Sequence, residues 1–334
     1  MRAALMVVTM SEKPVLRYYD LLRYQPENLA MLQERFQVEA VSSPDEDRPV
    51  GLSRIHAVIA PLGYLWGKEK IDLAPALKVI ASNTTGVPHI DVDYAVQRGI
   101  RVISLKNETD FLESITPTAE MTWALILGIV RRVPWSFLGV CSGEWERRNF
   151  GGTRMLSRMA LGIVGLGRLG KMVARIARSF GMRVLYYDPF VTVNWEGLRK
   201  LESMDELVSQ SDIVSVHIPM DPQNAALFDA ARFAHFRDGA YFINTSRGEI
   251  VNSDALRMAL ASGKLAGAAV DVLDGEFSPE FKHHVGEHPL VQYAKTHDNL
   301  LITPHIGGST VDAWRLTEQH TIELTLKALA ETVG

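Results

Sequence analysis

The sequence predicts an α/β protein built from two doubly wound parallel sheets. Short apolar runs of strand length alternate with segments in which apolar residues recur at helical spacing. The alternation occurs twice, once within residues 2–105 and again, in a longer series, from Met159 onward. The second series opens with LGIVGLGRLG, residues 161–170, where three glycines follow an apolar run. This alternation is typical of parallel sheets with helices on both faces.

The first series contains four predicted strands and two predicted helices. The strands are 2–8 (RAALMVV), 57–62 (AVIAPL), 76–86 (ALKVIASNTTG, running into a polar turn) and 100–105 (IRVISL). The helices are 26–36 and 90–99, the second closed by Gly99. The chain start has no small-residue cleavage pattern, which favours a buried first strand over a signal peptide.

Residues 115–133 (ITPTAEMTWALILGIVRRV) are predicted to form a long helix between the two series. Thr116 is expected to cap it, with Pro117 at the first helical position. Apolar residues on two faces predict burial between domains or subunits, and the apolar run 121–130 is too short to span a bilayer. Residues 135–152 are expected to be a connector.

The second series predicts six buried strands, each followed by a turn or a helix. The strands are 159–165, 182–188, 211–219, 240–246, 266–273 and 299–306. Helices are expected at 171–180 and 204–210, and the tail 309–333 is expected to be one long amphipathic helix.

The composition narrows the function classes. The chain has 334 residues, 47% of them hydrophobic, which is enough for two domains with sizeable cores. A net charge of −4 argues against a general nucleic-acid or anionic-membrane binder. Cys141 is the only cysteine, so no internal disulfide can form, which fits a reducing compartment. We therefore expect a cytoplasmic protein.

The glycine spacing in residues 161–170 predicts a dinucleotide-binding turn. Gly165 allows the tight turn, Gly167 allows the backbone to approach a pyrophosphate, and Gly170 allows close packing of helix and strand. The helix that follows offers free N–H groups to the phosphates. Asp188 closes the next strand and is expected to accept hydrogen bonds from the ribose hydroxyls, which favours NAD over NADP.

Three more strands of the second series end in polar residues suited to chemistry. Arg247 follows one strand, Asp271 and Glu276 follow the next, and His305 follows the last. Ligands bind at the carboxyl ends of the strands in a doubly wound sheet. An arginine, a carboxylate and a histidine are thus expected to converge beside the predicted nicotinamide.

These motifs together resemble the D-isomer-specific 2-hydroxyacid dehydrogenase family. The resemblance rests on LGIVGLGRLGKMVARIARSFGMRVLYYDP, NTSRGEIV, the DVxxxE spacing and TPHIGGST, and it covers nearly the whole chain. It is to phosphoglycerate-dehydrogenase-like members without a regulatory domain. The resemblance implies an NAD-dependent oxidoreductase that interconverts a 2-keto acid and a D-2-hydroxy acid.

The resemblance also implies roles for individual residues. Arg247 would hold the substrate carboxylate and keto oxygen, His305 would be the general acid/base, and Glu276 would hydrogen-bond His305 and stabilise its protonated form. Asp271 would bind the nicotinamide carboxamide, and His217 would lie near the adenosine or would merely close its strand. The further cofactor contacts would be Arg168, Leu169, Pro219, Thr245, Ser246, Gly307 and Gly308.

Substrate contacts are expected from two loops of the first series. The residues are Leu62, Gly63, Thr85 and Gly86. Loop 60–67 has no cation before Lys68, whereas a phosphorylated substrate would require one, so an uncharged or apolar substrate tail is expected. Tyr64 and Trp66 would either line that pocket or belong to the core.

The family fold implies a discontinuous substrate domain and a central cofactor domain. The flavodoxin-like substrate domain would comprise 1–107 and 308–334, and the NAD-binding Rossmann domain 108–307. The active site would lie in the cleft between them, with hinge crossings near Asn107 and Gly307. Relatives form homodimers through the cofactor domain, and 116–133 is the expected contact segment.

Alternative functions remain open on the same fold. They are a NAD-sensing co-regulator, 3-phosphoglycerate dehydrogenase proper, and a formate- or phosphite-oxidising enzyme. Glu276 disfavours the last, since a glutamine pairs with the histidine in that branch. No metal-ligand spacing is present, and the cluster His283, His284 and His288 is expected to be a solvated surface.

Overall fold

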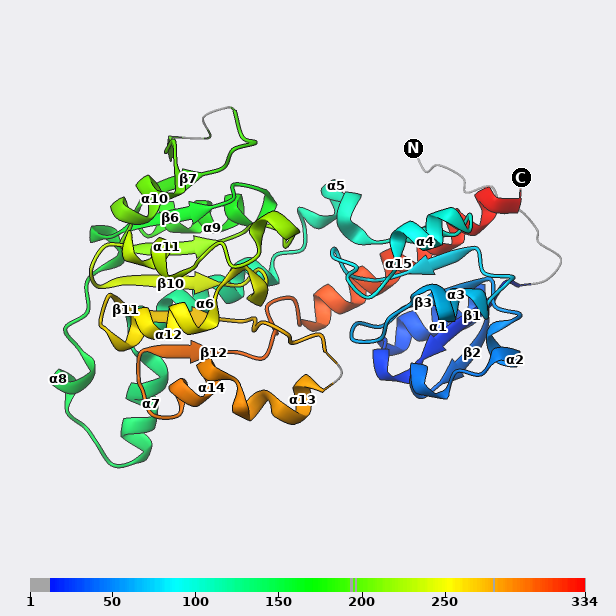
Figure 1. Cartoon of the computed structure of the whole chain (residues 1–334), viewed down its shortest axis with the longest axis horizontal. Helices are drawn as coiled ribbons and strands as arrows, with labels where there is room; N and C mark the ends of the chain where they lie inside the picture. The colour runs from blue at the N-terminus through cyan, green and yellow to red at the C-terminus, as the bar shows by residue number, and fades with distance from the viewer. Residues whose placement is uncertain (1–12, 193–194, 196, 279, 334) are drawn as a thin grey trace. The chain divides into compact units, whose positions relative to one another are not determined.

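The computed structural model describes residues 13–192, 195, 197–278 and 280–333, and it divides into two compact units. The first falls within Met1–Ile115 and Thr310–Gly334, and the second is Thr116–Ser309. Each unit has a sheet of its own (Figure 1). The predicted crossings near Asn107 and Gly307 stay a prediction.

Among the described residues, the sheet of the first unit has five strands, all paired in parallel. Its order is β2-β1-β3-β4-β5, the order of flavodoxin-like doubly wound sheets. The strands are β1 Val15–Tyr19, β2 Gln37–Val41, β3 Ala57–Ile59, β4 Val79–Ala81 and β5 Arg101–Ile103. The last three confirm predicted strands, β1 and β2 were missed, and the strand predicted at 2–8 lies outside the described residues.

Helices cover both faces of this sheet. They are α1 Pro26–Arg35, α2 Pro49–Leu52, α3 Lys68–Asp72, α4 Val92–Gln97, α5 Thr109–Leu112 and α15 Val311–Val333. The C-terminal α15 packs on α1, where the buried Glu318 carboxylate accepts hydrogen bonds from the Gln25 N–H (2.8 Å) and the Asn28 amide (2.9 Å). Residues from the two ends of the sequence therefore share one core.

In the part of the second unit that the structure describes, the sheet has seven parallel strands in the order β12-β11-β10-β9-β6-β7-β8. They are β6 Ala160–Val164, β7 Arg183–Tyr187, β8 Arg199–Lys200, β9 Ile213–Val216, β10 Ala240–Asn244, β11 Leu265–Val270 and β12 Leu300–Ile302. The chain order reverses between β6 and β9, which creates the crevice where dinucleotides bind in such sheets. The two sheets confirm the predicted fold class.

The helices of the second unit are α6 Pro117–Val130, α7 Val133–Cys141, α8 Arg147–Phe150, α9 Arg168–Ser179, α10 Met204–Gln210, α11 Ala230–Ala234, α12 Ser253–Ala261, α13 Phe281–His284 and α14 Pro289–Ala294. Of these, α6 and α9 pack in one core of the sheet and α10, α11, α12 and α14 in the other, whereas α7 and α8 have no buried residue. The predicted connector at 135–152 is wrong over much of its length, because α7 and α8 occupy it.

Helix α6 is buried against its own sheet and α9. Its buried face shares a core with Ile163 and Ala269 of the sheet and Val173 of α9, and the Trp123 indole N–H donates to the Val173 carbonyl at 3.2 Å. Pro117 is at the helix start as predicted, but the Thr116 hydroxyl caps no backbone N–H and donates to Glu120 at 2.5 Å. Tertiary packing therefore stabilises this helix.

Within the described part of the chain, no single helix is both long and apolar enough to cross a membrane. Helices Thr109–Val130 and Val133–Cys141 meet the criterion only as a pair bent by 60°.

Candidate active site

The glycine turn between β6 and α9 has the backbone geometry that its three glycines predict. Gly165 has a φ of +90°, and a Cβ there would lie 2.6 Å from the His217 carbonyl oxygen. A Cβ on Gly170 would lie 2.2 Å from the Gly165 carbonyl oxygen, so a side chain would separate the helix from the turn. Gly167 is the N-cap residue of α9.

The start of α9 suits an anionic ligand. A Cβ on Gly167 would meet no atom within 4 Å, which leaves space directly beside the backbone. Arg168 and Leu169 form the first turn, which contains no acidic residue. Helix N-termini carry unpaired N–H groups and a partial positive charge. The turn therefore fits the pyrophosphate of a dinucleotide.

Asp188 ties the end of β7 to this turn. Its Oδ2 accepts a hydrogen bond from the Leu166 N–H at 2.8 Å, and its Oδ1 accepts from the Phe190 N–H at 2.8 Å and the Val191 N–H at 3.2 Å. A carboxylate offers about four lone pairs, so one stays available to a ribose hydroxyl. The predicted ribose contact stays a prediction.

His217 follows β9 and packs behind the glycine turn. Its backbone N–H donates to the Val164 carbonyl at 2.7 Å, and its ring Nε2 lies 2.9 Å from the Ser215 hydroxyl. Its Nδ1 is buried and has no hydrogen-bond partner among the described residues. Burial lowers the pKa of His217 to about 4, so the ring is neutral near pH 7. Pro219, two residues on, is exposed.

We predict different effects for alanine at two of these glycines. Gly170→Ala forces its Cβ against the Gly165 carbonyl and is expected to lower the Tm by about 3–10 °C. Gly167→Ala meets open space, so its Tm is expected to stay within about 1 °C while NADH binds about tenfold more weakly. Thermal melts and NADH fluorescence titrations measure both effects, and unchanged NADH affinity in Gly167→Ala would contradict the assignment of this turn.

Arg247 lies in the loop after β10, held in place by Asn244. The Asn244 side-chain amide donates to the Arg247 carbonyl at 2.8 Å, and its oxygen accepts the Ser246 N–H at 2.9 Å. A Cβ on Gly248 would lie 2.0 Å from the Leu273 backbone, so this loop packs directly on the loop after β11. The half-buried Arg247 guanidinium lies 6.0 Å from the centre of the Phe277 ring.

Thr245 and Ser246 direct their hydroxyls into the unit. The Thr245 hydroxyl lies 2.9 Å from that of Thr122 on α6, and the Ser246 hydroxyl donates to the Val216 carbonyl at 2.7 Å. These bonds fix the loop that carries Arg247. The predicted cofactor contacts of both residues stay predictions.

His305 is paired with Glu276 across the loops after β12 and β11. The distance between His305 Nδ1 and Glu276 Oε1 is 2.8 Å, and the carboxylate side chain is 10% exposed, against 34% for the imidazole. This pairing leaves Nε2 as the ring nitrogen that is free to act. The backbone of His305 has a φ of +52°, a left-handed conformation that is uncommon for residues other than glycine.

Asp271 holds the loop that carries the imidazole. Its Oδ1 accepts from the Thr303 hydroxyl at 2.5 Å and the Ile306 N–H at 3.0 Å, and its Oδ2 accepts from the Gly307 N–H at 2.7 Å. The carboxylate is buried. Its predicted contact with a nicotinamide stays a prediction, as do those of Gly307 and Gly308, but its bonds within the protein already position His305.

Phe277 brings the three predicted catalytic groups together. Its ring centre is 5.7 Å from that of His305 and 6.0 Å from the Arg247 guanidinium, and it directly follows Glu276. An imidazole, its carboxylate partner and a guanidinium thus surround one aromatic ring. Nothing in the spacing of the sequence identified Phe277, because a lone aromatic in a polar loop carries no signal.

The four predicted substrate contacts lie in the first unit, in the loops that follow β3 and β4. Leu62 and Thr85 are exposed, Gly63 has a φ of +84°, and the Gly86 carbonyl accepts the Thr84 hydroxyl at 2.7 Å. Since β3 and β4 are parallel neighbours, their loops share one edge of the sheet. Their contact with a substrate stays a prediction.

Two other residue predictions have clear outcomes. Trp66 is fully buried and belongs to the core, while Tyr64 is half-buried. His288 was expected to be solvated and is not: its ring is 8% exposed and bridges Asp274 (2.9 Å) and the Leu290 N–H (3.2 Å). In the described residues, no group of His, Cys, Asp and Glu is arranged to hold a metal ion.

Comparison with known proteins identifies one family. Residues 123–307 match the model of the D-isomer specific 2-hydroxyacid dehydrogenase, NAD binding domain. The chain is 35% identical to a glyoxylate reductase of Thermofilum pendens over 299 residues, which are 85% of this chain and 83% of that protein.

Other relatives are longer than this chain. It is 31% identical to a D-3-phosphoglycerate dehydrogenase of Mycobacterium tuberculosis over 86% of its own length but 52% of the relative's, so it spans about half of that protein. Among solved structures, a D-lactate dehydrogenase of Aquifex aeolicus, complexed with NAD and lactic acid, superposes with a TM-score of 0.79 at 27% identity. That match covers 95% of this chain and 96% of the other.

Proposed function

Because the chain belongs to the D-isomer specific 2-hydroxyacid dehydrogenase family, we propose that it is an NAD-dependent oxidoreductase interconverting a 2-keto acid and a D-2-hydroxy acid. One observation carries the proposal. The His305–Glu276 pair and the Arg247 guanidinium are assembled around Phe277, at the carboxyl ends of β10, β11 and β12. A proton donor and a carboxylate clamp are the two groups that reduction of a 2-keto acid requires.

In the proposed reaction, Arg247 binds the substrate carboxylate through the fork of its guanidinium. Negative charge builds on the keto oxygen during reduction, and His305 Nε2 donates a proton to it. The Glu276 carboxylate fixes the ring through Nδ1 and stabilises the imidazolium from which the proton leaves. In oxidation of the hydroxy acid, the same nitrogen accepts the proton.

NAD would supply or accept the hydride. The residues proposed to hold it are the glycine turn, which receives the pyrophosphate at the start of α9, and Asp188, which faces the adenosine ribose. Because the Asp188 carboxylate would repel a 2′-phosphate, NAD is preferred to NADP. The positive end of α9 offsets part of the charge of the two phosphates.

We propose that the substrate tail is uncharged. Loop 60–67 after β3 contains no lysine or arginine. Lys68, the first cation that follows it, forms an ion pair with Asp72 at 3.0 Å and donates a hydrogen bond to the Tyr94 hydroxyl at 2.9 Å. A phosphorylated tail placed here would lack a partner for its charge. The observation argues against 3-phosphoglycerate as the substrate, although relatives with that name match the chain.

A panel of keto acids with NADH tests the activity. We expect absorbance loss at 340 nm with at least one of glyoxylate, pyruvate, hydroxypyruvate and branched 2-keto acids, and none with 3-phosphohydroxypyruvate at the same concentration. Chiral analysis of the product from pyruvate, hydroxypyruvate or a branched 2-keto acid should find the D-hydroxy acid; the product from glyoxylate has no stereocentre. Turnover of none of these substrates would refute the proposed activity, and preference for the phosphorylated one would refute the proposed tail.

We propose that the protein is a homodimer and that α7 forms part of the contact. The predicted segment 116–133 is largely covered by its own unit, whereas α7 has no buried residue. Val133, Phe137 and Val140 form one exposed stripe at helical spacing, and Trp145 beyond the helix is 88% exposed. Apolar surface of this extent favours a protein partner. The exposed Cys141 thiol fits a cytoplasmic location, which we also propose.

The variant Phe137→Glu/Val140→Glu tests this contact. Charges placed on both apolar positions should convert the dimer into monomers, because burying them unpaired costs several kcal/mol. Light scattering after gel filtration measures the mass. Met258→Glu, on an exposed apolar side chain of α12, is the control expected to stay dimeric. A wild-type monomer, or a double variant that stays dimeric, would contradict the proposal.

A further inference from the structure

A hollow lies in the second unit, at the sheet edge opposite the glycine turn. It has a volume of about 280 Å³ and is formed where strands begin. Ala160 starts β6, Arg183 starts β7, and Asp212 immediately precedes β9. The glycine turn and the His305 site follow strand carboxyl ends, so this amino-end hollow is distinct from both.

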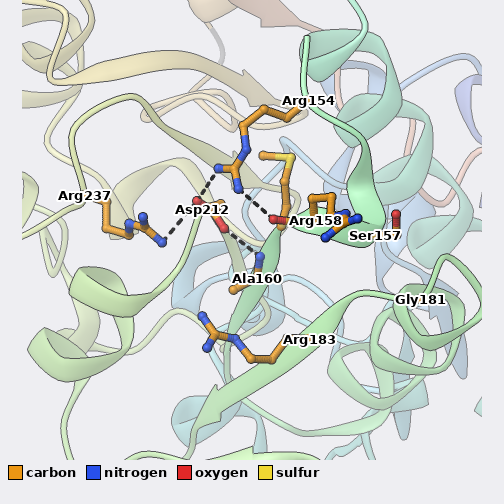
Figure 2. Close-up of a pocket in the computed structure, with 9 residues that line it drawn as sticks. Arg154, Ser157, Arg158, Ala160, Gly181, Arg183, Asp212 and Arg237 are labelled. Carbon is orange, nitrogen blue, oxygen red and sulfur yellow. Dashed lines mark hydrogen bonds and ion pairs between the residues drawn. The ribbon is translucent and has the colours of Figure 1, made fainter.

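The hollow is strongly basic. Arg154, Arg158, Arg183 and Arg237 line it with a single carboxylate, that of Asp212 (Figure 2). Four guanidinium groups against one carboxylate leave an excess of positive charge in a protein whose net charge is −4. A local excess of positive charge in a protein of negative net charge favours the binding of an anion.

Asp212 fixes two of these arginines in place. Its Oδ1 accepts a hydrogen bond from Arg154 Nη1 at 2.7 Å and lies 3.2 Å from Arg237 Nη1, and its Oδ2 accepts the Ala160 N–H at 2.7 Å. Figure 2 shows the two arginines reaching Asp212 from different sides. Burial raises the pKa of Asp212, but the Ala160 amide and Arg154 lower it by more, so the carboxylate is charged at neutral pH.

The other two arginines, Arg158 and Arg183, differ from this pair in their contacts. The side chains of Arg158 and Arg183 are exposed and make no ion pair or hydrogen bond with any residue that the structure describes. The carboxyl end of α9 lies nearby at Gly181 and attracts cations, but a helix end carries only about half a charge. It therefore does not account for a cluster of four guanidinium groups.

We propose that this hollow binds a small anion bearing a diphosphate group. Guanidinium forks bind phosphate oxygens in pairs, and arginines held by Asp212 lose little freedom on binding. Asp212 balances only one of the four positive charges, so Arg158 and Arg183 can attract the ligand's phosphate oxygens. The Ser157 hydroxyl in the lining adds a hydrogen-bond donor. Four arginines gathered around one hollow of about 280 Å³ suit a compact ligand better than an extended nucleic acid, which requires a longer basic surface.

Calorimetric titration of the full-length protein with inorganic pyrophosphate tests the site. The ionic strength is held constant, and saturating NADH occupies the glycine turn so that pyrophosphate cannot bind there. We expect saturable binding at one site per chain. The double variant Arg158→Gln/Arg183→Gln should weaken it about tenfold or more, because two charge-assisted contacts are lost.

Arg257→Gln provides the matched control. Arg257 is an exposed arginine of the same unit, on α12 and outside the hollow. This control should bind pyrophosphate as the wild type does. No saturable binding at constant ionic strength, or equal losses in the control and the double variant, would overturn the proposal.

Two further measurements identify the source of the anion and exclude an interface. Titration with ADP under the same conditions shows whether a nucleoside adds affinity; tighter binding of ADP assigns a nucleotide, and equal binding assigns a free diphosphate. Light scattering should give the double variant the mass of the wild type. A changed mass would assign the arginines to a contact between copies and overturn the ligand site. None of these readouts needs turnover, so they are independent of the proposed activity.

Discussion

Replacement of His305 by asparagine is expected to lower kcat by about 10²–10⁴-fold while NADH affinity stays within about twofold. Proton transfer by a positioned side chain typically contributes this much to the rate. Asparagine can donate a hydrogen bond to the keto oxygen but cannot release a proton to it. It also tolerates a positive φ, so the backbone of +52° at this position need not change.

Steady-state kinetics with the best keto acid of the panel, together with an NADH titration, measure these effects. Glu276→Gln is the companion variant: it keeps the hydrogen bond to Nδ1 but removes the charge that stabilises the imidazolium. Its kcat should fall less than that of His305→Asn. If His305→Asn retains more than a third of the wild-type kcat, another group donates the proton and the proposed mechanism is wrong.

Replacement of Arg247 by glutamine is expected to lower kcat/KM for the keto acid by about 10²–10³-fold. Two charge-assisted hydrogen bonds to the substrate carboxylate are lost, each worth about 1.5–3 kcal/mol. Arg247→Lys should lie between the wild type and the glutamine variant, since lysine keeps the charge but not the fork. The loop itself should persist, because Asn244 holds it through the backbone carbonyl of residue 247.

The matched control for Arg247 is a change of substrate. The methyl ester of the same keto acid has no carboxylate but keeps the keto oxygen, so Arg247→Gln should lose a much smaller factor with the ester than with the acid. If the variant lost the same factor with ester and acid, Arg247 would act on something other than the carboxylate. NADH affinity should not change in either case.

The parts of this molecule that were predicted correctly are those in which a single strong pattern in the sequence determines the local structure. Buried parallel strands are continuous apolar runs, so six of the seven strands of the second sheet were located correctly. The seventh, β8, was missed because it is a two-residue strand made of an arginine and a lysine. The catalytic candidates were found because they directly follow such strands, and the structure pairs His305 with Glu276 at 2.8 Å. The glycine turn was found because each glycine has a steric reason to be there.

The missed elements are those in which tertiary contacts overrule local composition. Strands β1 and β2 carry Arg17 and Glu39, whose charges hid them, although Arg17 is buried through ion pairs with Glu39 at 3.6 Å and Asp47 at 3.5 Å. Residues 135–152 contain aromatics and glycines, which indicated a connector, yet much of this segment lies in α7 and α8.

The roles of Phe277 and Asp271 in holding the site could not be predicted for a different reason. Both depend on which loops touch, and loop contacts leave no periodic pattern in a sequence. The arginine hollow was missed in the same way, because its four arginines lie from residue 154 to residue 237 and meet only when the strands align.

The left-handed backbone at His305 implies a conflict between the stability of the fold and catalytic activity. A histidine held at a φ of +52° costs about 1 kcal/mol or more that glycine would not cost there. Random mutagenesis selected only for thermal stability should therefore enrich glycine or asparagine at position 305. The resulting proteins should be more stable but catalytically inactive. Retention of the imidazole in a working enzyme would mean that selection has accepted a weaker fold at this point to preserve chemistry.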